Sequence, residues 1–257
     1  MEIQIKNETE KDYREVEELT REAFWNLYVP GADEHFIVHN LRKSKNFIKH
    51  LDLVAVHQDK IVGSIIYTLS YIEDEFNQKH EVITFGPVSI LPEFQNKGIG
   101  RKLIEYSIKK ARDLSYKAII IYGYPDYYSK YGFKSGKNYN ICTPEGTYMK
   151  ALQVLELQDN ALKGIHGKFF QDNAFYYDES EKEKFDKTFS EKEKLITESQ
   201  KKFEEMLNMF EWTGKKENMV IIWKKSMKAL FFNSNKGIIE ENYEEFHPVE
   251  AEKETDM

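Results

Sequence analysis

The sequence predicts an α/β fold in which helices flank a sheet, and three observations support this prediction. Apolar runs of strand length alternate along residues 1–156 with segments whose apolar residues recur at the helical period. One strand, at residues 81–91, leads through a glycine-containing turn directly into a long amphipathic helix. A further apolar run, Lys117 to Tyr122, follows that helix and is short enough to be a buried strand. Together these segments predict one sheet-based domain.

Residues 1–45 predict one strand and two helices. Ile3 to Ile5 alternate with polar neighbours, as in a half-buried strand. A helix then starts at Thr9 or at Lys11-Asp12. Its apolar residues share one face: Tyr13, Val16, Leu19, Ala23 and Phe24. Pro30-Gly31 predicts a turn, and residues 32–45 predict the second helix.

The next segments predict the central strands. Residues 51–57 and 60–72 form a pair of strands around the turn Gln58-Asp59. Residues 81–91 give the following strand, which Pro92 ends because proline has no backbone donor. Two closing strands are expected near the end of the domain, at Phe133 to Ile141 and at Lys150 to Glu156.

The turn between the strand and the long helix has the chemistry of an anion site. Its two glycines, Gly98 and Gly100, permit backbone angles that other residues avoid. The first amides of a helix have no carbonyl partner within it, so those from Gly98 to Arg101 point together. The positive end of the helix dipole lies at the same place, and Lys97 and Arg101 add charge there. The sequence therefore predicts a pyrophosphate-binding turn.

Two common phosphate-binding loops do not fit this turn. The Walker loop ends in Gly-Lys-Ser or Gly-Lys-Thr, and the dinucleotide loop needs a third glycine where this chain has Leu103. The segment Gln95-Asn96-Lys97-Gly98-Ile99-Gly100 instead resembles the Gln-x-x-Gly-x-Gly motif of the GNAT superfamily of N-acetyltransferases. Taken alone, the hexapeptide leaves open an ordinary strand-to-helix turn that binds no ligand.

A second motif strengthens the resemblance. Residues 123–133 read GYPDYYSKYGF, which resembles the Tyr-x-x-x-Gly-Phe ending of the fourth helix in this superfamily and looks like a bacterial subgroup of it. The tyrosine of this ending is Tyr128, while we expect Tyr127 and Tyr131 only to pack on the sheet. One departure is Ile121, because many members carry asparagine at that place.

The resemblance implies a GNAT-type mixed, mostly antiparallel sheet with splayed central strands, flanked by helices. Gly86-Pro87 favours a bulge at the splay, because glycine weakens a sheet ladder and proline cannot donate to it. Acetyl-CoA would bind along this strand and at the turn. The binding residues that the resemblance implies are Val88, Ser89, Ile90, Gln95, Asn96, Lys97, Gly98, Ile99, Gly100 and Arg101.

The resemblance also implies transfer of the acetyl group from acetyl-CoA to a primary amine, by direct attack in a ternary complex. Tyr128 is implied as the general acid for the departing thiolate, since a tyrosine with a pKa of about 10 is protonated at neutral pH. The alternative is that Tyr128 only packs or hydrogen-bonds the sulfur of the coenzyme. Glu34 and His35, at the start of the second helix, are the candidate bases; a helix-capping role, simple packing, or a water relay are the alternatives.

Composition restricts partners and location. The net charge of −7 argues against general nucleic-acid binding, and the single cysteine rules out an internal disulfide. No cluster of cysteine or histidine has metal-site spacing, and no leader or membrane-spanning apolar run is present. We therefore expect a cytoplasmic protein that binds no metal, nucleic acid or membrane. Its partner would be an amine acceptor, either a small molecule or a peptide.

The chain is expected to divide after residue 177. Residues 1–177 predict the acetyltransferase domain, and residues 178–257 predict an acidic, partly helical C-terminal extension with a frayed tail from residue 240. Four apolar residues of this extension share a helical face: Ile196, Phe203, Leu207 and Phe210. Such a stripe predicts docking on the domain or on a partner, including a second copy in a homodimer.

Two other functions compete with the amine acetyltransferase. The first is a non-catalytic module that senses acyl-CoA and reports through the C-terminal extension. Release of free thiol with a panel of amines distinguishes it, because a sensor binds the coenzyme without releasing thiol. The second is an acetyltransferase that modifies nucleic acid, which the negative net charge disfavours.

Overall fold

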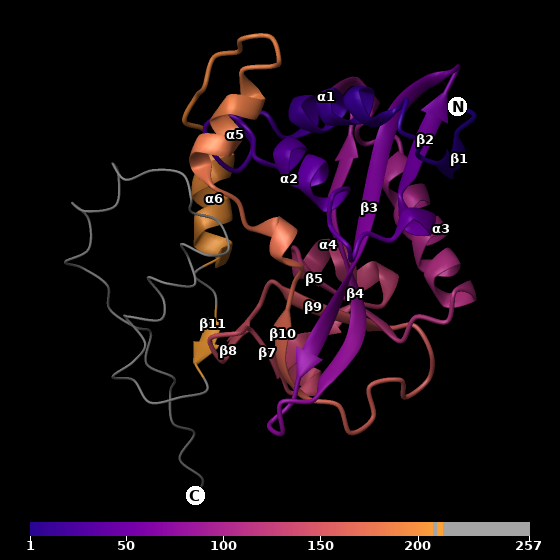
Figure 1. Cartoon of the computed structure of the whole chain (residues 1–257), viewed down its shortest axis with the longest axis vertical. Helices are drawn as coiled ribbons and strands as arrows, with labels where there is room; N and C mark the ends of the chain where they lie inside the picture. The colour runs from indigo at the N-terminus through magenta and orange to yellow at the C-terminus, as the bar shows by residue number, and fades with distance from the viewer. Residues whose placement is uncertain (208–209, 213–257) are drawn as a thin grey trace, which may run out of the picture.

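The computed structural model describes residues 1–207 and 210–212 (Figure 1). The helices are α1 (Tyr13–Phe24), α2 (Glu34–Leu41), α3 (Ile99–Asp113), α4 (Pro125–Tyr128), α5 (Glu179–Asp186) and α6 (Glu198–Leu207). The strands are β1 (Gln4–Asn7), β2 (Leu53–His57), β3 (Lys60–Glu73), β4 (Lys79–Ile90), β5 (Ala118–Tyr122), β6 (Lys134–Ser135), β7 (Ile141–Cys142), β8 (Thr147–Met149), β9 (Leu152–Glu156), β10 (Gly167–Phe170) and β11 (Phe210–Trp212). In these ranges, no helix is both long and apolar enough to cross a bilayer.

Nine of the described strands form one sheet. Its order is β1-β2-β3-β4-β5-β9-β6, and β10 pairs with both β3 and β7. The pairs β4–β5 and β7–β10 are parallel, whereas the other pairs in this sheet are antiparallel. A separate two-stranded sheet joins β8 to β11. The fold is therefore the mixed, mostly antiparallel α/β arrangement that the sequence predicts.

Helices cover both faces of the sheet. On one face, Ser89 of β4 donates a hydrogen bond to Thr20 of α1 at 3.0 Å. Ser64 lies opposite Ser89 in the β3–β4 register, and Tyr67, three positions further along β3, points to the other face. There its hydroxyl lies 2.8 Å from that of Ser107 on α3. The long strands β3 and β4 are thus the central layer between α1 and α3.

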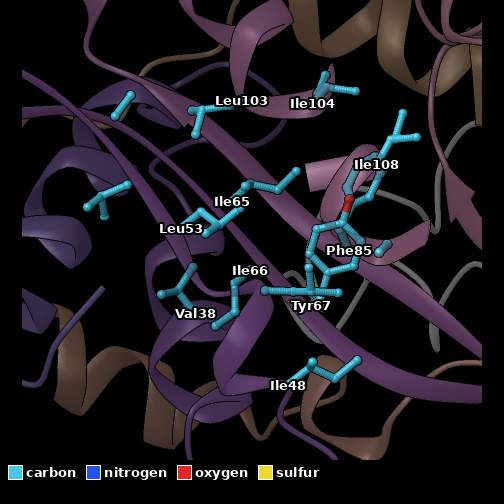
Figure 2. Close-up of a cluster of buried hydrophobic side chains, with 14 of the residues drawn as sticks. Val38, Ile48, Leu53, Ile65, Ile66, Tyr67, Phe85, Leu103, Ile104 and Ile108 are labelled. Atoms are coloured by element: carbon cyan, nitrogen blue, oxygen red, sulfur yellow. The ribbon is translucent and has the colours of Figure 1, made fainter. Parts of the chain in front are cut away.

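The core consists mainly of aliphatic side chains from both layers, with several aromatic rings among them. Figure 2 shows Tyr67 and Phe85 beside isoleucine and leucine side chains. The two rings belong to neighbouring strands and their centroids lie 5.2 Å apart. The removal of these apolar side chains from water provides the main driving force for folding. It also makes β3 and β4 a rigid support for the residues at their ends.

One expected closing strand is wrong. The segment from Phe133 to Ile141 contains only the short β6, a 3-10 turn at Gly136–Tyr139 and the beginning of β7. A Cβ atom on Gly136 would lie 2.6 Å from the carbonyl oxygen of Ile141, and Asn140 has a left-handed φ of 53°. These two residues let the chain fold back on itself. The second helix is also shorter than expected, since α2 ends at Leu41.

The described part of the C-terminal extension contains α5 and α6, which lie beside α1 and α2 (Figure 1). Within the predicted apolar stripe, Phe203 stacks on Tyr28 with ring centroids 4.3 Å apart, so part of the stripe docks on the domain. Ile196, in contrast, precedes α6 and is 74% exposed, and Phe210 belongs to β11. The prediction that all four residues share one helical face is therefore wrong. The frayed tail expected from residue 240 lies outside the described residues.

Candidate functional site

An opening between β4 and β5 is the feature around which the candidate site is built. The two strands run parallel, and their register contains a single pair, Ile83 with Ile119. Beyond that point β4 continues to pair with β3 as far as Ile90. Over the described residues, the edge of β4 that faces β5 therefore lacks a partner strand after Ile83. Such an edge offers backbone donors and acceptors to a bound molecule.

A bulge lies where the strands separate. Val88 is opposite Ile65 and Gly86 is opposite Ile66, so that Pro87 has no counterpart on β3. The bulge predicted from Gly86-Pro87 is confirmed. It bends β4 locally, as an extra residue in one strand does, and it has the one residue type that cannot donate a ladder hydrogen bond.

An aromatic residue closes one side of this bulge. A Cβ atom on Gly86 would lie only 2.4 Å from the ring of Phe175, so glycine is required for the close approach. Phe175 belongs to a turn that Asp172 anchors by accepting hydrogen bonds from Ser44 at 2.9 Å and from Asn46 at 2.6 Å. The sequence analysis did not single out Phe175, because nothing local to residue 175 indicates a contact with residue 86.

The residues expected to contact pantetheine lie on the strand beside the opening. Val88 and Ile90 are half-buried, whereas Ser89 is fully buried and its hydroxyl is engaged with Thr20. The side chain of Ser89 therefore has a structural role. Only its backbone, along with that of Val88 and Ile90, is placed to meet a ligand in the opening.

The glycine turn connects β4 to α3 with left-handed backbone angles. Asn96 has a φ of 58° and Gly98 a φ of 80°. The amide of Lys102 donates to the carbonyl of Gly98 at 3.1 Å, so the amides of Ile99 and Gly100 precede the first full turn. These amides have no carbonyl partner inside the helix. The turn thus has the left-handed backbone and the free amides at a helix head that the sequence predicts, which is the chemistry of an anion site.

Three side chains of the turn are engaged within the protein. Gln95 donates to the carbonyl of Ile90 at 3.1 Å, and Lys97 donates to the carbonyl of Glu93 at 2.7 Å. Arg101 pairs with Glu105 at 2.7 Å, at an exposed position. Exposed contacts of this kind are weak because water screens them, so both cations can turn toward an anion at little cost.

Tyr128 packs beside β4 at Phe85, in the part of the strand that has no partner toward β5. Its ring packs against Phe85 and Phe133, with centroid distances of 5.8 and 5.6 Å. It also lies against the backbone of Gly123, where a Cβ atom would approach the ring to 2.3 Å. Burial raises the pKa of Tyr128 far above its ordinary value, and the neighbouring phenols, including that of Tyr28, raise it further. The hydroxyl is therefore a protonated group held in a fixed place.

Two other tyrosines of the motif border the turn. Tyr127 is 39% exposed, and its hydroxyl lies 3.5 Å from the place that a Cβ atom of Gly100 would occupy. Tyr131 is half-buried and packs on Tyr127 with a centroid distance of 5.9 Å. Tyr127, which we expected only to pack on the sheet, therefore lies at the head of α3. Ile121, which departs from the family pattern, is buried in the core.

Glu34 begins α2 and is half-buried. Its carboxylate accepts a hydrogen bond from the amide of Asp33 at 3.1 Å. Burial, followed by the nearby charge of Asp33, raises the pKa of Glu34 to about 8. A carboxyl group with this pKa can hold and release a proton near neutral pH, as a general base requires.

His35 has no access to the opening. Its side chain is fully buried between the rings of Phe185 and Phe189, and Nε2 lies 3.2 Å from the carboxylate of Asp186. Burial lowers the pKa of His35, although Asp186 opposes this effect. A side chain enclosed in this way can support its neighbours, but it cannot contact an acceptor.

Tyr28 is a site residue that the sequence analysis missed. Burial raises the pKa of Tyr28, and the charge of Glu34 raises it further. Tyr28 in turn contributes to the raised pKa of Tyr128. Glu34, Tyr28 and Tyr128 therefore lie close enough to interact, although they come from α2, the preceding loop and α4. The aromatic-rich segment at residues 24–28 was the only available signal. No group of three potential metal ligands occurs among the described residues.

Comparisons with known sequences agree with this geometry. The family model for the acetyltransferase (GNAT) domain matches residues 49–135, which span β4, the glycine turn, α3, β5 and α4. The N-acetyltransferase YhbS of Escherichia coli K12 is 27% identical over 133 residues, covering 51% of this chain and 76% of YhbS. YjhQ, an N-acetyltransferase of the same organism, is 27% identical over 103 residues, covering 40% of this chain and 56% of YjhQ.

Solved structures show the same fold. YhbS from Escherichia coli in complex with CoA has a TM-score of 0.60 and 21% identity, with 67% of this chain and 91% of that chain covered. A GNAT family acetyltransferase from Brucella melitensis in complex with acetyl-CoA has a TM-score of 0.56 and 25% identity, with 68% and 98% covered. Each similarity extends over most of the relative's chain and about two thirds of this one.

Proposed function

Because this chain belongs to the GNAT family of acetyltransferases, we propose that it transfers the acetyl group of acetyl-CoA to a primary amine by direct attack in a ternary complex. The acceptor is a small molecule or a peptide. The observation that carries this proposal is the meeting of two binding features at one end of β4. The strand edge is open beyond Ile83, and the uncapped head of α3 follows nine residues after Ile90.

The coenzyme fits these features by its chemistry. Its diphosphate would accept hydrogen bonds from the amides of Ile99 and Gly100, where the helix dipole is positive. Lys97 and Arg101 would turn toward the same charge. The pantetheine would lie along the backbone of Val88 to Ile90, with its amides satisfying the open edge of β4.

The reaction needs two proton movements, and the site has one group for each. The amine nitrogen forms a bond to the thioester carbon, and the carbon–sulfur bond breaks. Glu34 would take the proton that the amine loses, and Tyr128 would give its proton to the departing thiolate. Holding both reactants in line supplies a further part of the rate. The single cysteine fits the reducing cytoplasm that we propose as its compartment.

The proposal is tested with the full-length chain, acetyl-CoA and a panel of primary amines. Calorimetry should detect binding of acetyl-CoA, and free thiol should appear only when a suitable amine is present. If acetyl-CoA binds and no amine releases thiol above background, the chain is an acyl-CoA sensor instead. If the coenzyme does not bind, both functions are excluded.

Replacing Tyr128 with phenylalanine is expected to lower kcat about a hundredfold, because the thiolate then leaves without a proton. The ring remains, so packing against Phe85 and Gly123 and the affinity for acetyl-CoA should be preserved. Steady-state kinetics and calorimetry measure the two effects. The matched control is Tyr106→Phe, which removes a hydroxyl from an exposed position on α3. An unchanged kcat in the Tyr128 variant would remove this residue from the mechanism.

A further inference from the structure

Residues 178–205, which we call the C-terminal arm, lie against α1, α2 and the loop between them at residues 25–33 (Figure 1). Asp186 of the arm accepts a hydrogen bond from Nε of Arg21 at 2.8 Å and lies 3.2 Å from Nε2 of His35. Arg21 and His35 are both buried, one on α1 and the other on α2. A single carboxylate therefore ties the arm to both helices that flank the loop.

A second ion pair anchors the arm beside the candidate base. Nζ of Lys182 donates to Asp33 at 2.9 Å and also pairs with Glu179 on its own helix. Lys182 and Asp33 are both buried, so the pair is shielded from solvent. Asp33 directly precedes Glu34, and the positive charge of Lys182 lowers the pKa of Glu34 against the larger effect of burial. The arm thus acts electrostatically on the first turn of α2.

Hydrogen bonds from the arm hold the backbone of the loop itself. The carbonyl of Asn26 accepts from Thr197 Oγ1 at 2.9 Å and from Gln200 Nε2 at 3.2 Å. The hydroxyl of Ser199 donates to the carbonyl of Leu27 at 2.8 Å. Asn26 has a left-handed φ of 59°, a turn conformation that asparagine tolerates. Side chains of the arm bind the carbonyl groups of this turn and so hold the loop in place.

The last contact reaches the site. Phe203 of α6 stacks on Tyr28, with ring centroids 4.3 Å apart and planes inclined by 25°. Tyr28 belongs to the loop that leads into α2, and its ring also packs against Phe24 of α1 at 5.7 Å between centroids. The ring of Phe203 therefore fixes Tyr28 between the arm and α1, in the loop that ends at the proposed base.

We propose that the C-terminal arm is a positioning element of the acceptor site, which holds the 25–33 loop and the first turn of α2 and so keeps Tyr28 and Glu34 in place. The inference rests on the proposed function, because that function makes Glu34 the base and Tyr128 the acid. Lys182 and Phe203 are positioning residues and not catalytic residues. Each acts through the residue that it touches.

The first test changes the charge that the arm brings to the base. The groups that interact with Glu34 are Asp33, Lys182, Tyr28 and Tyr177. In Lys182→Met one positive charge is lost, so the carboxylate of Glu34 becomes less stable and its pKa rises further. The lower pKa in the pH profile of kcat/KM should therefore move up by about one unit. Lys182→Arg keeps the charge and should restore the original profile.

The second test changes the stacking contact without removing a buried charge. Phe203→Leu keeps an apolar side chain but loses the ring face, so Tyr28 is no longer held in one orientation. The KM for the amine should rise about tenfold, while the Kd for acetyl-CoA stays unchanged. The control is Lys201→Ala, on the same helix, where the side chain is 69% exposed. This control should match the unchanged chain in both constants.

The outcomes separate the two proposals. If the unchanged chain transfers acetyl groups, and if neither the pH profile of Lys182→Met nor the amine KM of Phe203→Leu changes, the positioning role is wrong and the function stands. A Phe203→Leu variant whose KM for the amine and Kd for acetyl-CoA rise equally would also contradict it, because general destabilisation then explains the effect. Failure of the unchanged chain to transfer any acetyl group would overturn the function, and this inference with it.

Discussion

Glu34→Gln is expected to lower kcat/KM for the amine by about 10²- to 10⁴-fold, the usual contribution of a general base. The amide has nearly the same shape as the carboxyl group, so binding of acetyl-CoA at the distant α3 turn should not change. Glu34 is half-buried, and its carboxylate accepts a hydrogen bond from the amide of Asp33. It is not a direct partner in the ion pairs of the described residues, so the substitution leaves no buried cation unpaired. The loss should therefore appear in the rate and not in the fold.

The same substitution should abolish a specific pH dependence. A base works only when deprotonated, and burial raises the pKa of Glu34 to about 8. Activity of the unchanged chain should thus increase as the pH rises toward about 8 and then level off. The measurement requires an amine of low pKa, which stays unprotonated over this range and adds no titration of its own. Retention of the pH-dependent rise in Glu34→Gln would favour a water relay.

The free energy of unfolding should also depend on the protonation of Glu34, but it should decrease as the pH rises. The folded-state pKa of Glu34 lies above its ordinary value of 4.5, so the folded chain binds its proton more tightly than the unfolded chain does. The stability that this provides is complete below the ordinary pKa and is lost as the pH rises through about 8. Melting curves of Glu34→Gln should lack this component, whereas the exposed Glu18→Gln on α1 should retain it.

Gly100→Asp is expected to lower the affinity for acetyl-CoA about a hundredfold or more, because a carboxylate at the head of α3 repels the diphosphate. The same carboxylate interacts favourably with the helix dipole, by about 0.3–1 kcal/mol, so the melting temperature should stay level or rise slightly. A Cβ atom at this position meets nothing closer than 3.5 Å, and the side chain can therefore be accommodated. Calorimetry and thermal melting measure the two effects separately.

Two alanine variants serve as controls for this prediction. Gly100→Ala adds no charge and fits the space, so most of the affinity should remain. Gly98→Ala meets no atom within 4 Å, but its φ of +80° should cost about 1–2 kcal/mol of stability. Should Gly100→Asp bind acetyl-CoA as tightly as the unchanged chain, the head of α3 is not the diphosphate site.

Local patterns predicted the elements that carry the coenzyme side of the site. The bulge follows from Gly86-Pro87 and the turn from its glycines, because each depends on the conformational limits of a few consecutive residues. The segment after Phe133 could not be assigned in the same way. Its apolar residues are compatible with a strand. In the folded chain, however, Gly136 lies close to the carbonyl of Ile141, so the segment turns back instead of continuing as a strand. That contact exists only after folding.

The acceptor side shows the limit of local information. Glu34 and His35 are neighbours at the start of one helix, and nothing in the sequence separates them. The fold does, because Asp186 and two phenylalanine rings enclose His35 while Glu34 stays half-exposed. The stacking partner of Tyr28 is Phe203, which lies far along the chain, so no local pattern indicates that contact.

By itself, the sequence determined the order of strands and helices as far as α4, the bulge and the glycine turn, because hydrophobic periodicity and backbone angles are properties of adjacent residues. Tertiary structure alone decided that His35 is enclosed while Glu34 stays half-exposed, that Tyr28 stacks on Phe203, and where the C-terminal arm is anchored. The bond from Lys182 to Asp33 joins residues 149 positions apart. A contact of that separation exists only after the sheet has formed and brought both helices to the same face.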